Sequence, residues 1–329
     1  MRNPRETILS RRDILRATGA AVPGILLEGC LRADRIGKSE GEALPIRPLG
    51  RTGAPVSILT LGTGHLRSQH GIDAAQVEGI VDRALELGVT SIDTAPNYSE
   101  AEEYLGHALK SRRNQVFLAT KSEEPTYEGC WNLLHKSLKR LQTDYIDLVY
   151  IHNIGLESRF PNVNEVLGPK GTLAALSEAK RQGVIRFIGA SGHFHPARFK
   201  SFLERDEIDV VMTAVNLVAR HIYNFEEKVF LPAQRKNLGL VAMKVLGGAW
   251  KEGKARLPDE HYDAAIRYAM EIPGISTLNI GVRNVAELER AAQAVRTYVP
   301  LTKSERIELS NLGKQLAESW GPIYGEPIT

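Results

Sequence analysis

The segment "VTSIDTAPNYSEAEEYLG" (residues 89–106) changes within a few residues from the pattern of a buried strand to that of an amphipathic helix. An ionisable residue, Asp93, ends the strand-like half, and Tyr98 follows where the chain turns toward the helix. In barrels and open α/β sheets, catalytic groups lie at the carboxyl ends of the strands. The segment therefore predicts a strand-to-helix unit with functional residues at its turn.

The same unit recurs along the chain. One strand-like run ends at Gly62, and the others occupy residues 89–94, 116–121, 145–152, 185–191, 210–216, 240–246 and 276–282. Helix-like runs follow at residues 73–88, 100–111, 130–141, 172–183, 197–206, 225–237, 261–270 and 285–295. Eight alternating units predict a parallel sheet closed into a (β/α)₈ TIM barrel. The alternative is a doubly wound fold, whose G-x-G-x-x-G motif is incomplete in "GTGHLR" (62–67).

Two additions flank these units. The segment "PIRPLGRTGAPVSILTLGTG" (45–64) predicts a small N-terminal β-hairpin that turns at Arg51–Gly53, ahead of the first barrel strand. The periodic run 302–320 predicts one extra helix after the eighth unit.

The composition narrows the class of protein. The 329 residues are 43% hydrophobic and 25% charged, which is typical of a globular chain. The 42 basic and 39 acidic residues are scattered, so no basic stripe indicates a nucleic-acid partner. Cys30 and Cys130 form neither a disulfide framework nor a metal cage, and Cys130 is expected in a core helix. "HFH" (193–195) lacks acidic or cysteine partners at metal spacing, so we expect no metal.

The N-terminus is expected to be separate from the barrel. "SRRDILRATGAAVPGILLEGC" (10–30) resembles a twin-arginine export signal, with a pair of arginines before an apolar stretch too short to span a bilayer. Its end resembles a lipidation box at Cys30, although Glu28 is unusual there. We expect a signal at 1–30, a linker at 31–43 and the barrel at 44–329. The expected location is the periplasm or another extracytoplasmic site, with the cytoplasm as the alternative.

Polar side chains end three of the predicted strands. Asp93, Lys121 and His152 take these positions, and Tyr98 lies just beyond Asp93, so all four are expected at one rim. An ammonium beside a phenol favours the phenolate and lowers its pKa, and a carboxylate behind the ammonium keeps it charged. Tyr98 would then act as a general acid, with His152 bonding the same substrate oxygen. This set suits carbonyl reduction, whereas a purely structural Asp93–Lys121 ion pair is the alternative.

These residues resemble the catalytic tetrad of the aldo/keto reductases. Asp93, Tyr98, Lys121 and His152 match that family's Asp, Tyr, Lys and His in order, spacing and strand position, and the resemblance extends from about residue 46 to residue 299. "DTAPNYSEAEEYLG" is similar to the family signature, with Ser99 in place of a glycine and Ala101 in place of a serine.

The resemblance implies a nicotinamide cofactor, NADP(H) or alternatively NAD(H), extended across the barrel mouth. The implied cofactor-binding residues are Gly62, Thr63, Asp93, Ser191, Gly192, Met212, Met243, Lys244, Arg283 and Asn284. Three of them depart from the common pattern: Gly192 replaces an Asn, Met212 a Gln and Met243 an aromatic residue. Arg283 stands where the family grips the adenosine phosphate at a helix start, which favours NADP(H).

Three functions follow. The favoured one is an NAD(P)H-dependent reductase of aldehydes or ketones, with a small carbonyl compound as substrate. The second is an NADP(H)-binding redox sensor or partner-binding protein with little turnover, which the thinner carboxamide contacts at Gly192 and Met212 favour. The third is a Schiff-base lyase that uses Lys121. His65 and His70 are candidates for lining a substrate pocket, or belong to an ordinary solvated loop.

Overall fold

The computed structural model describes residues 43–248 and 255–326. The predicted export signal with Cys30 lies outside the described residues, as does the predicted linker apart from its last residue. No helix in the described ranges is long and apolar enough to cross a membrane.

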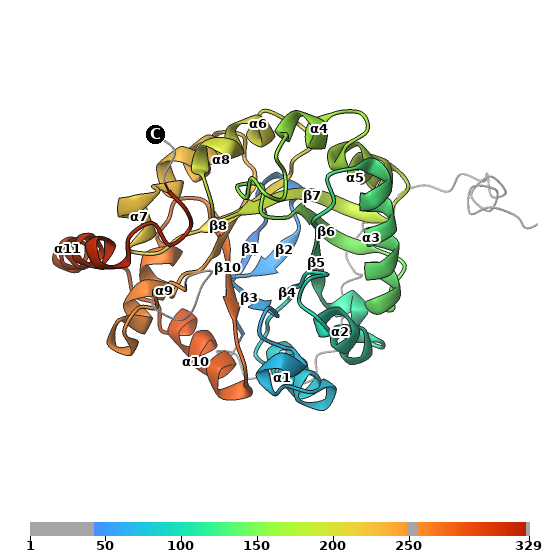
Figure 1. Cartoon of the computed structure of the whole chain (residues 1–329). Coiled ribbons are helices and arrows are strands. Elements are labelled where there is room, and N and C mark those ends of the chain that lie inside the picture. Colours follow the sequence, from blue (N-terminus) through green and yellow to red (C-terminus); the bar gives the residue numbers. More distant parts are fainter. Residues whose placement is uncertain (1–42, 249–254, 327–329) are drawn as a thin grey trace, which may run out of the picture. The chain divides into compact units, whose positions relative to one another are not determined.

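Eight parallel strands close into a barrel in the order β10-β3-β4-β5-β6-β7-β8-β9 (Figure 1). A separate antiparallel pair, β1 and β2, forms the hairpin. The strands are β1 Ile46–Pro48, β2 Pro55–Ser57, β3 Leu59–Gly62, β4 Ser91–Asp93, β5 Phe117–Ser122, β6 Ile146–Ile151, β7 Ile185–Gly192, β8 Val210–Ala214, β9 Gly239–Met243 and β10 Ile275–Gly281. The predicted (β/α)₈ barrel with an N-terminal hairpin is therefore confirmed.

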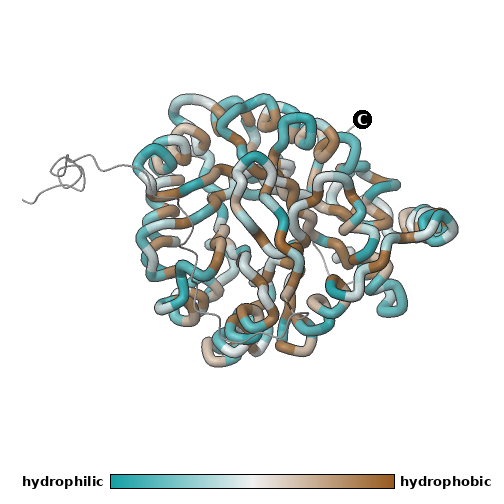
Figure 2. Tube along the Cα trace, turned by 180° about the vertical axis from the view of Figure 1, so that it is seen from behind, coloured by the Kyte–Doolittle hydropathy of each residue, from teal (hydrophilic) through white to brown (hydrophobic). Residues whose placement is uncertain are grey.

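Helices surround the barrel strands (Figure 1). They are α1 Ala74–Glu86, α2 Ala101–Leu109, α3 Tyr127–Arg140, α4 Val163–Leu167, α5 Thr172–Arg181, α6 Phe199–Leu203, α7 Ala219–Ile222, α8 Leu231–Arg235, α9 Tyr262–Met270, α10 Val285–Arg296 and α11 Lys303–Trp320. The last is the predicted extra helix, and it begins with a capping box between Thr302 and Glu305. Figure 2 shows hydrophilic positions concentrated on the outer helices.

One predicted helix has a different form. The run 225–237 is divided into a π-helical segment, Glu226–Phe230, and the short α8. Pro232 lies at the start of α8, where its missing N–H costs least. A continuous α-helix through Pro232 would lose a backbone hydrogen bond and meet a steric clash, which explains the break.

The hairpin closes the amino end of the barrel. Leu49 and Val56 from the hairpin are buried together with Phe117, Leu148 and other inward side chains of the strands. The backbone N–H of Arg51 donates to the carbonyl of Asn237, just before β9. The opposite, carboxyl end therefore remains the open one, where a ligand can enter.

The C-terminal segment after α11 returns to this open end. Tyr324 is fully buried, with its ring 5.1 Å from that of His193 and 5.5 Å from that of Tyr223. The Tyr223 hydroxyl donates to the Gly325 carbonyl at 2.9 Å and accepts from the Tyr324 N–H at 2.7 Å. The segment thus forms part of the wall beside the end of β7.

Candidate active site

The strand register brings the predicted residues to one rim of the barrel. Asp93 at the end of β4 pairs with Gly62 on β3 and with Ala119 on β5. Lys121 follows Ala119 by two residues on β5, so the side chains of Ala119 and Lys121 point to the same, inner face of the barrel. Because β4 and β5 are neighbouring parallel strands, Asp93 and Lys121 lie close together inside the barrel mouth, as predicted.

Lys121 is held by several acceptors at once. Its Nζ donates to Asp93 Oδ2 at 2.7 Å and to the Thr94 carbonyl at 2.6 Å. The ammonium also lies 4.9 Å from the centre of the Tyr98 ring. Asp93 Oδ2 accepts a further hydrogen bond, from Asn279 Nδ2 at 2.8 Å. The side chains of Lys121 and Asp93 are only 2% and 5% exposed, so this network is shielded from solvent screening.

Burial and charge oppose each other at this network. Burial has the largest single effect on Lys121 and would lower its pKa, but the Asp93 carboxylate and the Tyr98 phenol together outweigh it and raise that pKa. At Tyr98, burial raises the pKa, and the Lys121 ammonium only partly offsets the effect. The expected lowering of the Tyr98 pKa is therefore not obtained, because desolvation disfavours the phenolate more strongly than the ammonium favours it. The phenol keeps its proton, which is the form that a general acid needs.

The protonation state of Lys121 decides whether it could act as a Schiff-base nucleophile. Schiff-base formation requires a neutral amine with a free lone pair. The raised pKa of Lys121 and its hydrogen bonds to Asp93 and Thr94 keep the ammonium protonated. The geometry therefore argues against nucleophilic catalysis by Lys121.

His152 lies next to Tyr98 but has a partner that we did not expect. The two rings are 6.5 Å apart, edge to face. His152 Nδ1 is 2.6 Å from Glu123 Oε1, and Arg159 Nη1 donates to the same oxygen at 2.8 Å. Burial lowers the pKa of His152 to about 4 in spite of the Glu123 carboxylate. The ring is therefore neutral at pH 7, with Nδ1–H donated to Glu123.

The turn between β4 and α2 is strained at one residue. Ser99 has φ +51°, in the left-handed region that favours glycine. This is the position where the sequence signature places a glycine and the chain has a serine. The turn conformation is thus retained at a conformational cost of about 1 kcal/mol.

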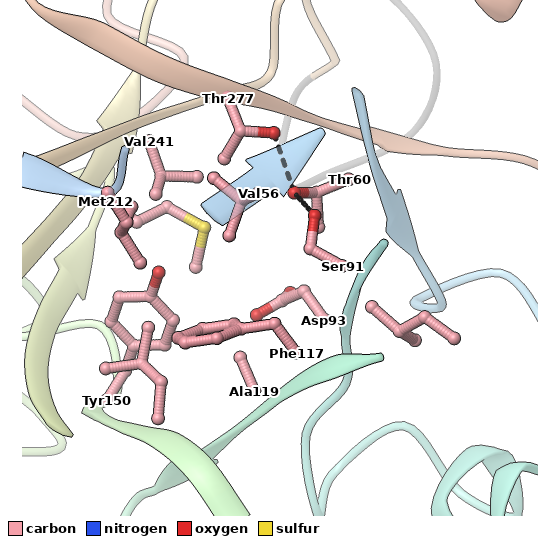
Figure 3. Close-up of a pocket in the computed structure, with 13 residues that line it drawn as sticks. Val56, Thr60, Ser91, Asp93, Phe117, Ala119, Tyr150, Met212, Val241 and Thr277 are labelled. Carbon is pink, nitrogen blue, oxygen red and sulfur yellow. Dashed lines mark hydrogen bonds between the residues drawn. The ribbon is translucent and has the colours of Figure 1, made fainter. Parts of the chain in front are cut away.

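A small cavity lies inside the barrel below the rim (Figure 3). Asp93, Tyr150 and Met212 line it, and hydroxyl groups of Thr60, Ser91 and Thr277 hydrogen-bond along one wall. Asp93 Oδ1 is buried and has no hydrogen-bond partner among the described residues. The rim that carries Asp93 and Lys121 is therefore underlain by a largely apolar interior.

The implied nicotinamide contacts include residues at the ends of β3 and β7, the two strands that flank β4–β6 in the barrel. A side chain at Gly62 would overlap Asn279 Oδ1, so the glycine brings the backbone close to this edge. The N–H and hydroxyl of Thr63 both donate to the Asp93 carbonyl at 3.0 Å. Ser191 is fully buried, and its hydroxyl has a single long contact of 3.4 Å to the Ile151 carbonyl. It can exchange this contact for a ligand amide.

Met212 and Gly192 supply no amide to a ligand. Met212 Sδ accepts from Asn279 Nδ2 at 3.2 Å and faces the interior cavity. A side chain at Gly192 would be within 3.3 Å of the backbone at Ile154. Gly192 and Met212 therefore contribute van der Waals contacts and no side-chain amide, in contrast to the Asn and Gln that the family resemblance places at these positions.

Positive charge surrounds His65 at the mouth. Burial lowers the pKa of His65 to about 4, and the charges of Arg283, Lys244 and Arg67, together with His70 when it is protonated, add to the effect. Lys244 is half-buried after Met243 at the end of β9, with φ +58°, and burial lowers its pKa. Such a field fits an anionic ligand such as a dinucleotide diphosphate. His65 thus faces this charged edge, whereas the role of His70 as pocket lining stays a prediction.

Arg283 and Asn284 lie at the start of α10. Asn284 caps the helix by accepting from the Glu287 N–H at 2.9 Å, and Glu287 Oε2 accepts from the Arg283 N–H at 2.8 Å. The Arg283 side chain is exposed. The negative charge of Glu287 already occupies the N-terminus of α10, where the helix dipole favours an anion. We therefore expect weaker binding of an adenosine phosphate at this position.

Three residues of the site were not expected. Asn279 occupies an inward position of β10, a signal that alternation in "STLNIGV" carries. Glu123 follows Lys121 by two residues, which places it on the same side of the extended chain. Arg159 belongs to the loop before α4, and no local pattern predicts its contact. Cys130 is a buried residue of α3, as expected, and among the described residues no group of His, Cys, Asp and Glu is arranged for a metal.

The chain is similar to known oxidoreductases over most of the barrel. The model of the aldo/keto reductase family matches residues 58–263. D-arabinose 1-dehydrogenase from Saccharomyces cerevisiae is 29% identical over 80% of this chain and 89% of its own. An uncharacterized oxidoreductase of Bacillus subtilis, YqkF, is 32% identical, but the match spans only 53% of this chain and 57% of that protein.

Solved structures agree with this similarity. The holo form of the aldo-keto reductase AKR11C1 from Bacillus halodurans superposes with a TM-score of 0.68 at 27% identity, over 82% of this chain and 96% of that chain. The family model covers more than half of the chain, and the barrel with its rim of polar strand ends has the architecture of these relatives. The chain belongs to the aldo/keto reductase family of oxidoreductases.

Proposed function

We propose that the protein is an NAD(P)H-dependent reductase of aldehydes or ketones with Tyr98 as the general acid. The observation that carries the proposal is the buried Asp93–Lys121 pair, whose ammonium lies 4.9 Å from the centre of the Tyr98 ring. The Tyr98 O–H gives its proton to the carbonyl oxygen while negative charge develops there. Lys121 stabilises that charge, and Asp93 with Asn279 keeps the ammonium oriented.

A reduced nicotinamide would supply the hydride to the carbonyl carbon. Gly62, Thr63 and Ser191 would hold its amide end beside Tyr98, and the cations around His65 would hold the diphosphate. Met243 and Lys244 would border it at the end of β9. Arg283 with Asn284 supports NADP(H) over NAD(H), because the exposed guanidinium can pair with an added phosphate.

The test compares two tyrosine variants. Tyr98→Phe should fold and bind NADPH but lose about a thousandfold in the rate of reduction of a simple aldehyde, since only the proton donor is removed. Tyr104→Phe, a partly buried residue of α2 away from the rim, should keep wild-type turnover. Full turnover by Tyr98→Phe would end the proposed mechanism.

A second candidate is a dinucleotide-binding redox sensor with little turnover. The engagement of Met212 with Asn279 and the missing amide at Gly192 favour it, because both reduce the contacts that orient a carboxamide. Single-turnover fluorescence of bound NADPH separates the two candidates. A fast decay on addition of an aldehyde supports the reductase, and a stable signal supports the sensor.

We also propose export through the twin-arginine machinery, with lipid anchoring at Cys30 as a separate step. The paired arginines at residues 11 and 12 and the short apolar stretch after them support export. Fractionation of cells, with replacement of both arginines by lysine, tests it. A wild-type protein found only in the cytoplasm contradicts export.

A further inference from the structure

Below the rim, one side of the barrel interior is lined by hydroxyl groups. Thr60 on β3, Ser91 on β4 and Thr277 on β10 are buried, line the interior cavity and belong to three neighbouring strands. In TIM barrels the inward layers are dominated by bulky branched apolar side chains. Three adjacent hydroxyls in such a layer must find their hydrogen-bond partners inside the barrel.

These three groups form a hydroxyl chain that does not satisfy itself. Thr60 Oγ1 is 2.6 Å from Ser91 Oγ and 2.8 Å from Thr277 Oγ1, and these are the two hydrogen bonds that the three hydroxyls make among the described residues. Each hydroxyl carries one hydrogen, so two hydrogen bonds leave one of the three hydrogens without an acceptor. The hydroxyl chain can therefore donate one further hydrogen bond into the cavity.

Asp93 brings an unpaired acceptor to the same cavity. Its Oδ2 accepts from Lys121 and Asn279, whereas its Oδ1 is buried without a hydrogen-bond partner among the described residues. Asp93 follows Ser91 by two residues on β4, so both side chains point inward. Figure 3 shows the Asp93 carboxylate pointing from its strand toward Tyr150. A buried carboxylate oxygen without a donor is costly, so Oδ1 needs a partner.

Tyr150 adds a third polar group to the cavity wall. It lies on β6, is buried and lines the cavity together with Asp93. A side chain at Gly189 on β7 would come within 2.4 Å of Cδ1 of its ring, so the glycine leaves the space that the ring fills. A phenol hydroxyl both donates and accepts hydrogen bonds.

The size of the cavity fits one very small polar molecule. About 20 Å³ of it is open to the centre of a water molecule. A buried water needs on the order of 10–15 Å³ of such space and two to four polar partners. The cavity meets both conditions, and it is too small for a substrate or a cofactor.

We propose that this cavity holds one ordered water molecule, which donates to Asp93 Oδ1 and accepts the remaining hydrogen of the hydroxyl chain. Both oxygens of the Asp93 carboxylate are then held, Oδ2 by Lys121 and Asn279 at the rim and Oδ1 by the water from below. The water links the ion pair of the rim to a polar layer inside the barrel. This site does not depend on the reaction proposed above.

A crystal structure of the wild-type protein, at a resolution that shows ordered water, tests the proposal directly. We expect an electron-density peak about 2.6–3.2 Å from Asp93 Oδ1 and at hydrogen-bond distance from a second polar atom of the cavity wall. The peak should be present with and without bound NADPH, because the site lies below the rim. A cavity without this peak, or an Oδ1 that bonds only to protein groups or to the dinucleotide, overturns the proposal.

A matched pair of substitutions tests the same site in solution. Ala119 lines the cavity and pairs with Asp93 in the register of β4 and β5. Ala119→Ser and Ala119→Cys add one oxygen or one sulfur atom at this point and so displace the water. The added hydroxyl can replace the water as a donor to Asp93, whereas a thiol is a weak donor. In chemical denaturation, the folding equilibrium constant of Ala119→Ser should exceed that of Ala119→Cys by about fivefold.

Ala190 provides the control, because it is a fully buried residue of β7 in the large hydrophobic cluster. There Ala190→Cys should be more stable than Ala190→Ser, since an apolar core favours a thiol over a hydroxyl. A cysteine preference at both positions would show an apolar, dry cavity and overturn the proposal. If the Ala119 variants do not fold, the crystal structure decides. Neither measurement uses turnover, so a failure here leaves the proposed reductase untouched.

Discussion

The two halves of the barrel mouth hold their polar groups in different ways. On the side of β4 and β5, Asp93 and Lys121 are almost fully buried and share several hydrogen bonds with strand neighbours. On the side of β10 and α10, Arg283 is exposed, and its hydrogen bond to Glu287 is made by its backbone. The proposed function assigns proton transfer to the rigid half and the entry of a large ligand to the open half.

The largest test of this contrast removes one ammonium from each half. Lys121→Met should lower the free energy of unfolding by about 3 kcal/mol, because it leaves the buried Asp93 without its counter-charge. Lys244→Met has no ion pair to lose among the described residues and should cost less than about 1 kcal/mol. Chemical denaturation measures both. Equal losses would show that the two halves are equally rigid.

Acid should weaken the rigid half through His152. Its folded pKa of about 4 lies below the unfolded value of about 6.5, so the folded state binds fewer protons in this range. The associated stability is complete above pH 6.5 and is lost as the pH falls toward 4, by about 3 kcal/mol. Chemical denaturation between pH 7 and pH 4 measures this loss. The unfolding free energy of His152→Gln should depend less steeply on pH than that of the wild type. A slope unchanged by the substitution would assign the loss to other groups.

The open half is tested by Arg283→Ala. Loss of an exposed guanidinium should weaken NADPH binding by about fivefold and NADH binding by less, because only the former carries the extra phosphate. Fluorescence titration gives both dissociation constants, and the unfolding free energy should stay unchanged. A similar loss for both nucleotides would place Arg283 away from that phosphate.

The smallest expected effect concerns the turn between β4 and α2. Ser99→Gly should raise the stability by about 0.5 to 1 kcal/mol, since glycine adopts φ +51° without steric cost. Thermal unfolding detects a shift of a few degrees, and activity reports whether the turn still positions Tyr98. A lower stability would mean that the serine side chain makes a compensating contact.

The same contrast explains how much could be predicted from the sequence. The barrel strands and the groups at their ends were predictable, because hydrophobic periodicity locates strand ends and parallel pairing brings Asp93, Lys121 and His152 to one rim. The inward position of Asn279 could also have been predicted, from the alternation of inward and outward side chains along its strand. Arg159 was not, because its contact with Glu123 depends on a loop whose path no local pattern determines. The net pKa of Tyr98 also escaped prediction, since it depends on the extent of burial.

The buried Tyr324 makes the packing beside His193 sensitive to changes in the segment after α11. A carboxypeptidase that trims the protein past this ring would open a hole beside His193 without touching a barrel strand. The trimmed protein would still fold, because the strands and their helices are complete before that segment begins. Affinity tags and truncations near Tyr324 are therefore expected to change the packing beside His193 at the end of β7.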